Sequence, residues 1–327
     1  MAEIKRKPSL KPNIVGLCVF FGVLVLVAIL GIIISTLIFG GAGAAVMGGI
    51  PIFIAFVGFI MASVAIMKLG TTYTITEDNE IVIHFSFLRT MTMVYRLDQL
   101  TTLRYQQNLI ERWLGLATIH FGVFGQKSES TQTQQKDGVQ RFLERKMVAI
   151  PQGDEVYHRL MGMLKVEEEP VLYQAKPVVK PVLFKVVATL LIYAAVTAGT
   201  LISGSFFPDA SIVLMISSGI ITLITVFVLI GFVVDWLKLR RTTYAISETA
   251  AYRAHDYFFS KQHMVVPMRK ITNTKTIRNV FSYLLFKAGS VQLYTGGSDD
   301  PIFRLFRDYR EYADIFSKKY GIVWERI

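Results

Sequence analysis

The stretch TTYTITE at residues 71–77 returns as TTYAISE at residues 242–248, which lies 171 positions further along the chain. The offset persists without a gap as far as Ala117, which falls on Ala288. It also pairs four residues between these points: His84 with His255, Leu100 with Ile271, Thr101 with Thr272, and Asn108 with Asn279. A fixed offset held over this length predicts an internal duplication in which each copy is one structural unit.

The composition around these two copies is that of a membrane protein. Of the 327 residues, 52% are hydrophobic and only 18% are charged, whereas soluble domains carry more charge. The net charge is +11, and the basic excess falls in the N-terminal arm and after residue 234, next to apolar runs. This distribution favours an anionic membrane surface as the partner and argues against a nucleic-acid partner.

Four uncharged or nearly uncharged runs are long enough to cross a bilayer. They cover residues 14–39, 46–67, 186–203 and 212–234, and we expect four transmembrane helices in two hairpins. Four cations, Lys5, Arg6, Lys7 and Lys11, precede the first run, and no basic residue separates the first two runs. The positive-inside rule therefore predicts a multi-pass protein of the cytoplasmic membrane with both termini in the cytoplasm.

A β-rich segment and a closing helix follow each hairpin. Tyr73 and Ile75, and then Ile81 and Ile83, recur at a period of two, which is typical of strands. Apolar stripes predict helices at residues 154–165 and 308–320. The predicted order is an arm at 1–13, a hairpin at 14–67, a β-rich domain at 68–166, a linker at 167–181, a hairpin at 182–234 and a second β-rich domain at 235–327. The fold class is therefore α+β, with four transmembrane helices and two small curled sheets or barrels, each closed by a C-terminal helix.

This organisation resembles the membrane-anchored bacterial pleckstrin-homology-like (PH-like) family, which is often catalogued as a domain of unknown function. The resemblance rests on the strand that contains Thr72, Tyr73, Ile75 and Thr76, on the strand entry at residues 96–102, and on the run NLIERWLGLA at residues 108–117. The second copy departs from that run, because Leu284 replaces Trp113 and Phe286 replaces Gly115. The resemblance implies two cytosolic PH-like domains. Because the second copy departs from the run at 108–117, a binding surface formed by that run in the first domain is in doubt for the second domain.

The sequence offers no constellation for catalysis, a metal or a cofactor. Cys18 is the only cysteine, so a cysteine-based zinc site is excluded. The strand alternation places His84 and His255 on the outer faces of their strands, away from carboxylate partners. The first strand turn carries Glu77, Asp78 and Glu80, which would repel a phosphoinositide. We therefore expect a protein that is not an enzyme and needs no cofactor.

Two groups of residues are candidates for binding. Arg112 and Trp113 have the composition of a protein-binding hot spot if they are exposed, although a tryptophan in such a connection is more often buried against the sheet. Lys238, Arg240 and Arg241 follow the last apolar run and could contact anionic lipid headgroups. The alternative is that these three residues only fix the topology.

The predicted function is a membrane-anchored scaffold or accessory subunit whose two modules associate with an unknown protein partner or with other copies of the chain. The alternative is a channel or transporter subunit with regulatory PH-like domains. It predicts a polar path through the spans at Ser217, Ser218, Thr222 and Thr225. An enzyme acting on lipids is a weaker third option, because the carboxylate or histidine cluster that it would need is missing from the sequence.

Overall fold

The computed structural model describes residues 3–18, 22, 65, 68–87, 89–124, 145–166, 170–206, 211–278, 280–296, 302–307, 309–320 and 323–326. The first predicted hairpin and the polar stretch at 126–138 lie almost entirely outside this part of the chain. The described chain forms two compact units. Unit 1 comprises Met1–Glu168, Phe258–Pro267 and Gly296–Asp299, and unit 2 comprises Glu169–Tyr257, Met268–Thr295 and Asp300–Ile327.

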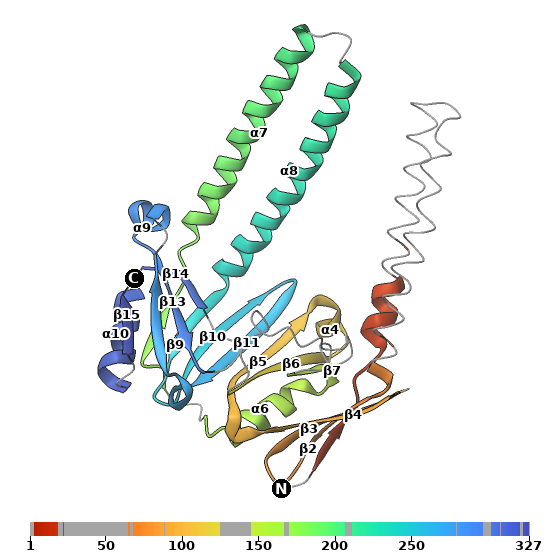
Figure 1. The fold of residues 1–327 in the computed structure, drawn as a ribbon, viewed down its shortest axis with the longest axis vertical. Helices are drawn as coiled ribbons and strands as arrows, with labels where there is room; N and C mark the ends of the chain where they lie inside the picture. Colours follow the sequence, from red (N-terminus) through yellow and green to blue (C-terminus); the bar gives the residue numbers. More distant parts are fainter. Residues whose placement is uncertain are drawn as a thin grey trace. The chain divides into compact units, whose positions relative to one another are not determined.

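Unit 1 contains an antiparallel sheet in the order β1-β2-β3-β4 (Figure 1). Its strands are β1 (Ile4–Arg6), β2 (Thr71–Ile75), β3 (Glu80–Phe87) and β4 (Arg89–Arg96). Alternate residues of β2 and β3, including Tyr73, Ile75 and Ile83, are almost fully buried. The period-two pattern of the sequence therefore places its apolar residues on one face, as predicted.

A second set of strands in unit 1 runs in the order β7-β6-β5-β11. The members are β5 (Leu100–Asn108), β6 (Leu116–Val123), β7 (Lys146–Pro151) and β11 (Ser260–Pro267), with the 3-10 turn η2 (Leu97–Gln99) before β5. The strand β11 comes from the second half of the sequence, and it pairs antiparallel with β5 from Ser260↔Asn108 to Val265↔Leu103. It therefore occupies the edge of β5 that would otherwise be open.

The predicted first closing helix is present as α6 (Gly153–Met163), which contacts β5 and β6. Its apolar stripe, Val156, Leu160 and Met161, is buried. Arg6 on β1 pairs with Glu155 on α6 at 3.2 Å. The N-terminal arm is therefore part of the sheet and packs with this unit.

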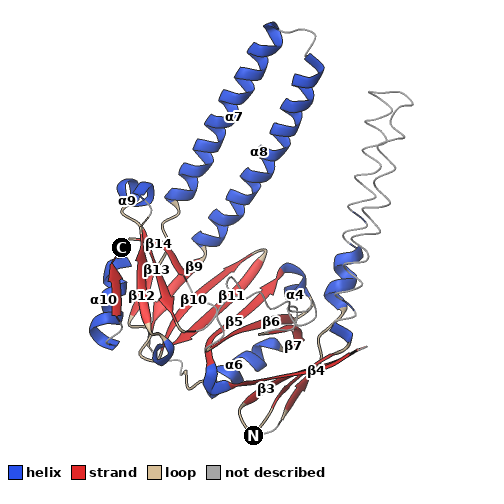
Figure 2. Cartoon of the chain, in the orientation of Figure 1, coloured by secondary structure: helices blue, strands red, loops and turns tan. Residues whose placement is uncertain are grey.

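Unit 2 contains two sets of strands (Figure 2). The first runs in the order β8-β9-β10 and the second in the order β14-β13-β12-β15. The strands are β8 (Tyr173–Ala175), β9 (Thr242–Ile246), β10 (Ala250–Tyr257), β12 (Asn273–Ile277), β13 (Gly289–Tyr294), β14 (Ile302–Phe306) and β15 (Val323–Arg326). The helices are α7 (Lys180–Phe206), α8 (Ser211–Arg240), α9 (Val280–Phe286) and α10 (Tyr309–Tyr320), and the 3-10 turn is η4 (Met268–Lys270). The strand β15 pairs parallel with β12 and so covers its edge.

A short strand precedes each apolar stretch of the chain and pairs with the strand that follows it. In unit 1, β1 pairs with β2 in the register Ile4↔Ile75. In unit 2, β8 pairs with β9 in the register Tyr173↔Ile246. Each pairing holds together the two segments that lead into and out of the intervening apolar residues.

Two tyrosines at the recurring stretch, Tyr73 on β2 and Tyr244 on β9, each join their strand to a strand of the second set in the same unit. Both are about 1% exposed. The Tyr73 hydroxyl accepts a hydrogen bond from the Val148 amide of β7 at 3.1 Å. The Tyr244 hydroxyl accepts one from the Arg304 amide of β14 at 2.9 Å and donates one to the Arg304 carbonyl at 3.2 Å. Burial raises the pKa of Tyr73 to about 12 and also raises the pKa of Tyr244.

The Tyr244→Phe variant tests this junction. Because the hydroxyl satisfies both backbone groups of Arg304, its removal should lower the free energy of unfolding of unit 2 by about 1–3 kcal/mol. The measurement is urea unfolding in detergent micelles, followed by hydrogen exchange of the β9 and β14 amides. The half-exposed Tyr294 provides the control variant Tyr294→Phe, which should change the stability by less than about 0.5 kcal/mol. Equal effects of the two substitutions would contradict the role given to Tyr244.

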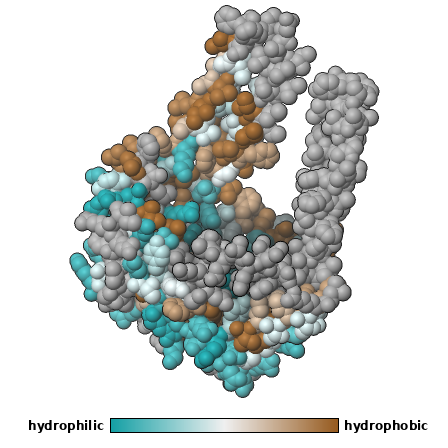
Figure 3. Space-filling view, in the orientation of Figure 1, coloured by the Kyte–Doolittle hydropathy of each residue, from teal (hydrophilic) through white to brown (hydrophobic). Residues whose placement is uncertain are grey.

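The prediction of four transmembrane helices is wrong. Within the described residues, one helix is long and apolar enough to cross a membrane, and it covers Lys180–Thr200 of α7. The prediction depended on hydropathy alone, and apolar length is shared by spans, core helices and signal sequences. Figure 3 shows apolar residues in brown along the exposed surface of α7 and α8, and only 6% of the apolar window of α7 is buried.

The prediction for the histidines also needs correction. His255 is only 2% exposed and its ring lies 5.7 Å from that of Tyr257. His84 is partly exposed, and its Nδ1 lies 3.0 Å from the Thr92 hydroxyl on β4. Strand alternation alone cannot distinguish an outer face in solvent from one covered by another element.

Candidate functional site

The run NLIERWLGLA folds as a single helical turn, α4 (Leu109–Trp113), between β5 and β6. Asn108 caps it, because the Asn108 Oδ1 atom accepts a hydrogen bond from the Glu111 amide at 2.8 Å. In return, the Glu111 Oε2 atom accepts one from the Asn108 amide at 3.1 Å. These reciprocal bonds form a capping box, which satisfies two amides that would otherwise lack partners.

The Glu111 carboxylate fixes this turn to the sheet below it. The residue is only 6% exposed. Its Oε1 atom accepts a hydrogen bond from the Thr118 hydroxyl on β6 at 2.6 Å, and the same hydroxyl accepts one from the Ala149 amide of β7 at 3.1 Å. One carboxylate therefore connects α4 to two strands of unit 1.

Gly115 ends the turn. Its φ of 65° lies in the left-handed region that favours glycine, and its amide donates to the Arg112 carbonyl at 3.3 Å. A Cβ atom added here would meet no atom within 4 Å, so the backbone conformation is what favours glycine. The chain then enters β6 with a fixed direction.

The result is a rigid turn that presents Arg112 and Trp113 to solvent. Trp113 is 78% exposed, so the interpretation that this tryptophan is buried against the sheet is wrong. Arg112 is also exposed. An exposed aromatic side chain beside an arginine, on a backbone that is already ordered, would lose little conformational entropy when a partner binds.

A buried cation lies near the same turn. Lys68 is 6% exposed, and its Nζ atom donates a hydrogen bond to the Asn13 Oδ1 atom at 2.6 Å. Burial lowers the pKa of Lys68, and the Glu111 charge opposes part of that shift. Asn13 and Lys68 flank the first predicted hairpin, so this bond joins its two ends.

The helix α9 (Val280–Phe286) of unit 2, which lies 171 positions after this turn, differs from it in its chemistry. The helix α9 places Leu284 at the position that matches Trp113, and Leu284 is 71% exposed. The residue with positive φ is Lys287, at 51°, rather than a glycine. The sequence departures therefore change the exposed side chains of this turn and leave a helix in place.

The three predicted lipid-contact residues lie at the end of α8. Arg240 and Arg241 are exposed and Lys238 is half-buried. The Arg240 guanidinium lies 5.3 Å from the centre of the Trp236 ring, which is a cation–π distance. The structure thus brings these residues together on one helix end, apart in sequence from Arg112 and Trp113.

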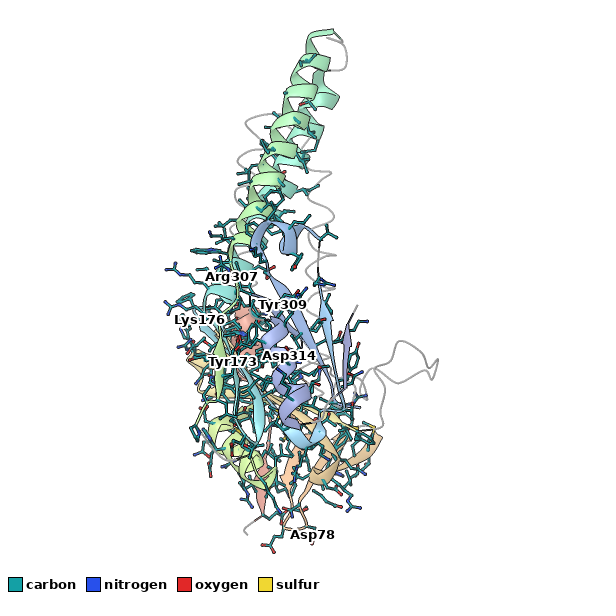
Figure 4. The ribbon with its side chains drawn as sticks, turned by 90° about the vertical axis from the view of Figure 1, so that its left-hand side faces the viewer. Asp78, Tyr173, Lys176, Arg307, Tyr309 and Asp314 are labelled. Atoms are coloured by element: carbon teal, nitrogen blue, oxygen red, sulfur yellow. The ribbon has the colours of Figure 1, made fainter. Side chains whose placement is uncertain are left out.

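The tip of the β2–β3 turn is acidic. Glu77 and Asp78 are exposed there, and Asp78 points outward at the tip (Figure 4). Among the residues that the structure describes, no cluster of three or more His, Cys, Asp or Glu side chains could hold a metal ion.

The helical turn α4 and the role of Glu111 were not predicted from the sequence. The signal was present, because an asparagine followed three residues later by a glutamate is a capping-box pattern. The exposure of Trp113 follows from the cap, since the Glu111 side chain turns inward and the next two residues point away from the sheet.

No curated protein matches the chain. Residues 14–164 match the family model described as "Bacterial PH domain", which includes α4 and most of the described part of unit 1. PH-like domains are generally non-catalytic modules that interact with proteins or lipids. This part of the chain is therefore similar to the bacterial PH domain family.

Proposed function

We propose that the protein is a membrane-anchored scaffold or accessory subunit, in which the Arg112–Trp113 turn of the PH-like domain binds another protein or a second copy of the chain. The observation that carries this proposal is the 78% exposure of Trp113 on a turn held by the Glu111 hydrogen bonds. An ordered aromatic side chain in solvent is costly to hydrate and is the kind of residue that dominates binding energy.

The apolar helix α7 supplies the anchor in this proposal. Leu191 and Ile192 in this helix are each 66% exposed, and Lys176, Lys180 and Lys185 lie just before or within its first turns. In this proposal the start of α7 lies at the cytoplasmic face, which the positive-inside rule favours for these cations. Lys238, Arg240 and Arg241 would contact anionic headgroups, with Trp236 beside Arg240 at the interface.

We further propose that residues 235–327 are a diverged copy of residues 68–166. Support comes from the order of elements, because β9, β10, β11, η4, β12, α9 and β13 follow one another as β2, β3, β4, η2, β5, α4 and β6 do. The buried alternation of β2 and β9 is also identical.

The Trp113→Ala variant tests the binding function. It should weaken the complex by about 2 kcal/mol, or roughly 30-fold, because a central aromatic contact is lost. A photo-crosslinking amino acid at position 113 of the full chain in native membranes identifies the partner, and the affinity of the purified pair is then measured for both variants.

Val94 on β4 is 52% exposed and supplies the control for both the crosslinking and the affinity measurement. The Val94→Ala variant should bind as the wild type does, and a crosslinker at position 94 should give no matching adduct. A chain that stays monomeric and gives no adduct from position 113 would falsify the proposal.

A further inference from the structure

The helix α9 of unit 2 exposes an unusually apolar surface for its size. Its sequence from Val280 to Phe286 is VFSYLLF. Val280 is 67% exposed, Leu284 is 71% exposed and Leu285 is 55% exposed. Three large apolar side chains in water on one short helix carry a hydration cost that a covering partner would remove.

The position of α9 indicates what covers it. The helix contacts α7, and Figure 1 shows it beside the end of α7 where that helix begins. Leu183, Phe184 and Val187, in the first turns of α7, are each about half exposed. The apolar surface of α9 is therefore continuous with that of the helix that has the composition of a span.

Cations and a tyrosine surround this apolar surface. The guanidinium carbons of Arg278 and Arg310 lie 5.5 Å and 5.8 Å from the centre of the Tyr283 ring, and the exposed Lys287 follows α9. Arg310 belongs to α10, beside Tyr309, so the cations come from both ends of α9 and from a neighbouring helix. Basic and aromatic residues around an apolar centre are typical of helices that lie in the membrane interface.

We propose that α9 is an interfacial membrane contact. In this arrangement, Leu284 and Leu285 insert among the lipids of the leaflet that the start of α7 enters, and Arg278, Lys287 and Arg310 pair with anionic lipid phosphates. The proposal rests on the membrane anchoring by α7 proposed above. It assigns different partners to the two equivalent turns: protein for α4, with its single exposed tryptophan, and lipid for α9.

A depth measurement tests this arrangement in the full chain. Cys18 is the only cysteine and is exposed, so the Cys18→Ser variant provides the background for single-cysteine labelling. An environment-sensitive dye is placed at Leu284→Cys, at Leu191→Cys and at Val94→Cys, and the protein is reconstituted in vesicles of phosphatidylcholine and phosphatidylglycerol. Spin labels on the lipid headgroup or deep on the acyl chain then quench each dye according to its depth.

We expect the dye at position 284 to be quenched strongly by the headgroup label and weakly by the deep label. The dye at position 191, which replaces a leucine that is 66% exposed in the middle of α7, should show the reverse. The dye at position 94 should be quenched by neither. In vesicles of phosphatidylcholine alone, headgroup quenching at 284 should decrease, whereas added inorganic phosphate should leave it unchanged.

The outcomes separate this inference from the proposed anchoring. If position 191 shows no quenching, α7 does not enter the bilayer and the proposed anchoring fails. If position 191 is quenched but position 284 behaves like position 94, only the interfacial role of α9 is overturned. A dye at 284 that reports an apolar environment without lipid quenching would mean that a protein covers α9, which also overturns the inference.

Discussion

The Tyr312→Ala variant is expected to lower the free energy of unfolding of unit 2 by about 3–5 kcal/mol, because it empties the centre of an aromatic cluster. Tyr312 on α10 is fully buried. Its ring lies within 5.5 Å of four others, which belong to Tyr173, Phe303, Phe306 and Phe316. Urea unfolding, followed by hydrogen exchange of the α10 and β13 amides, measures the effect.

The Tyr312→Phe variant is the matched control. Within the described residues the Tyr312 hydroxyl has no hydrogen-bond partner, so its removal keeps the packing and should raise stability by up to about 1 kcal/mol. A loss on substitution by phenylalanine that equals the loss on substitution by alanine would contradict this account.

The wild type and the Tyr312→Phe variant also test how the free energy of unfolding depends on pH. Burial raises the pKa of Tyr312 well above its ordinary value of 10.0. Below pH 10.0 the Tyr312 hydroxyl is protonated in both the folded and the unfolded state, so its contribution to the free energy of unfolding is fully present. As the pH rises above it, the unfolded state loses the proton and the buried hydroxyl retains it, which lowers the free energy of unfolding. Alkaline unfolding of the Tyr312→Phe variant should therefore be less steep than that of the wild type.

The Glu111→Ala variant is expected to lower the stability of unit 1 by about 2–3 kcal/mol. It removes the capping bond to the Asn108 amide and leaves the buried Thr118 hydroxyl without its acceptor. It also removes the charge that raises the pKa of Lys68, so the pKa of Lys68 should fall further. Hydrogen exchange of the β6 amides and NMR titration of the lysine provide the two measurements.

Two substitutions control for this prediction. Glu111→Gln keeps an acceptor and the capping geometry, so it should cost less than the alanine variant. Arg112→Ala changes an exposed neighbour and should alter stability by no more than about 0.5 kcal/mol. If Glu111→Ala and Arg112→Ala behave alike, the carboxylate does not hold the turn.

Local patterns predicted the strands and closing helices well. The alternation around Tyr73 and Tyr244 gives β2 and β9 in identical buried patterns, and the apolar stripes give α6 and α10. These elements bury one face against a core, and that face is recorded in the periodicity of the sequence. Of the four residues predicted to form the buried stripe of α10, Tyr309, Tyr312 and Phe316 are buried and Ile315 is partly exposed.

The pairing of strands that are distant in the sequence could not be predicted from the periodicity of the sequence. The three-residue strands β1 and β8 are too short to carry a period, and each forms only against a strand that follows an apolar stretch. The location of β11 against β5 depends on which open edge it meets, and its own alternation does not contain that information. The same limit explains the error at His255, whose outer face is covered by other parts of the chain.

The sequence named Arg112 and Trp113 as candidates for binding, but it did not predict the geometry of the turn that carries them. The composition of Arg112 and Trp113 indicated binding, but the exposure of Trp113 depends on Glu111 turning inward to Thr118. That contact joins residues on two elements and became visible only in the folded chain.

The strand β11 has a consequence for how the protein is made. A ribosome that has released residues 1–166 has produced most of unit 1, but the strand that completes its second sheet is encoded about a hundred codons later. During that interval the bare backbone of β5 is open to any nascent or misfolded chain nearby. Translation speed and chaperone occupancy across this window therefore bear directly on the yield of correctly assembled protein.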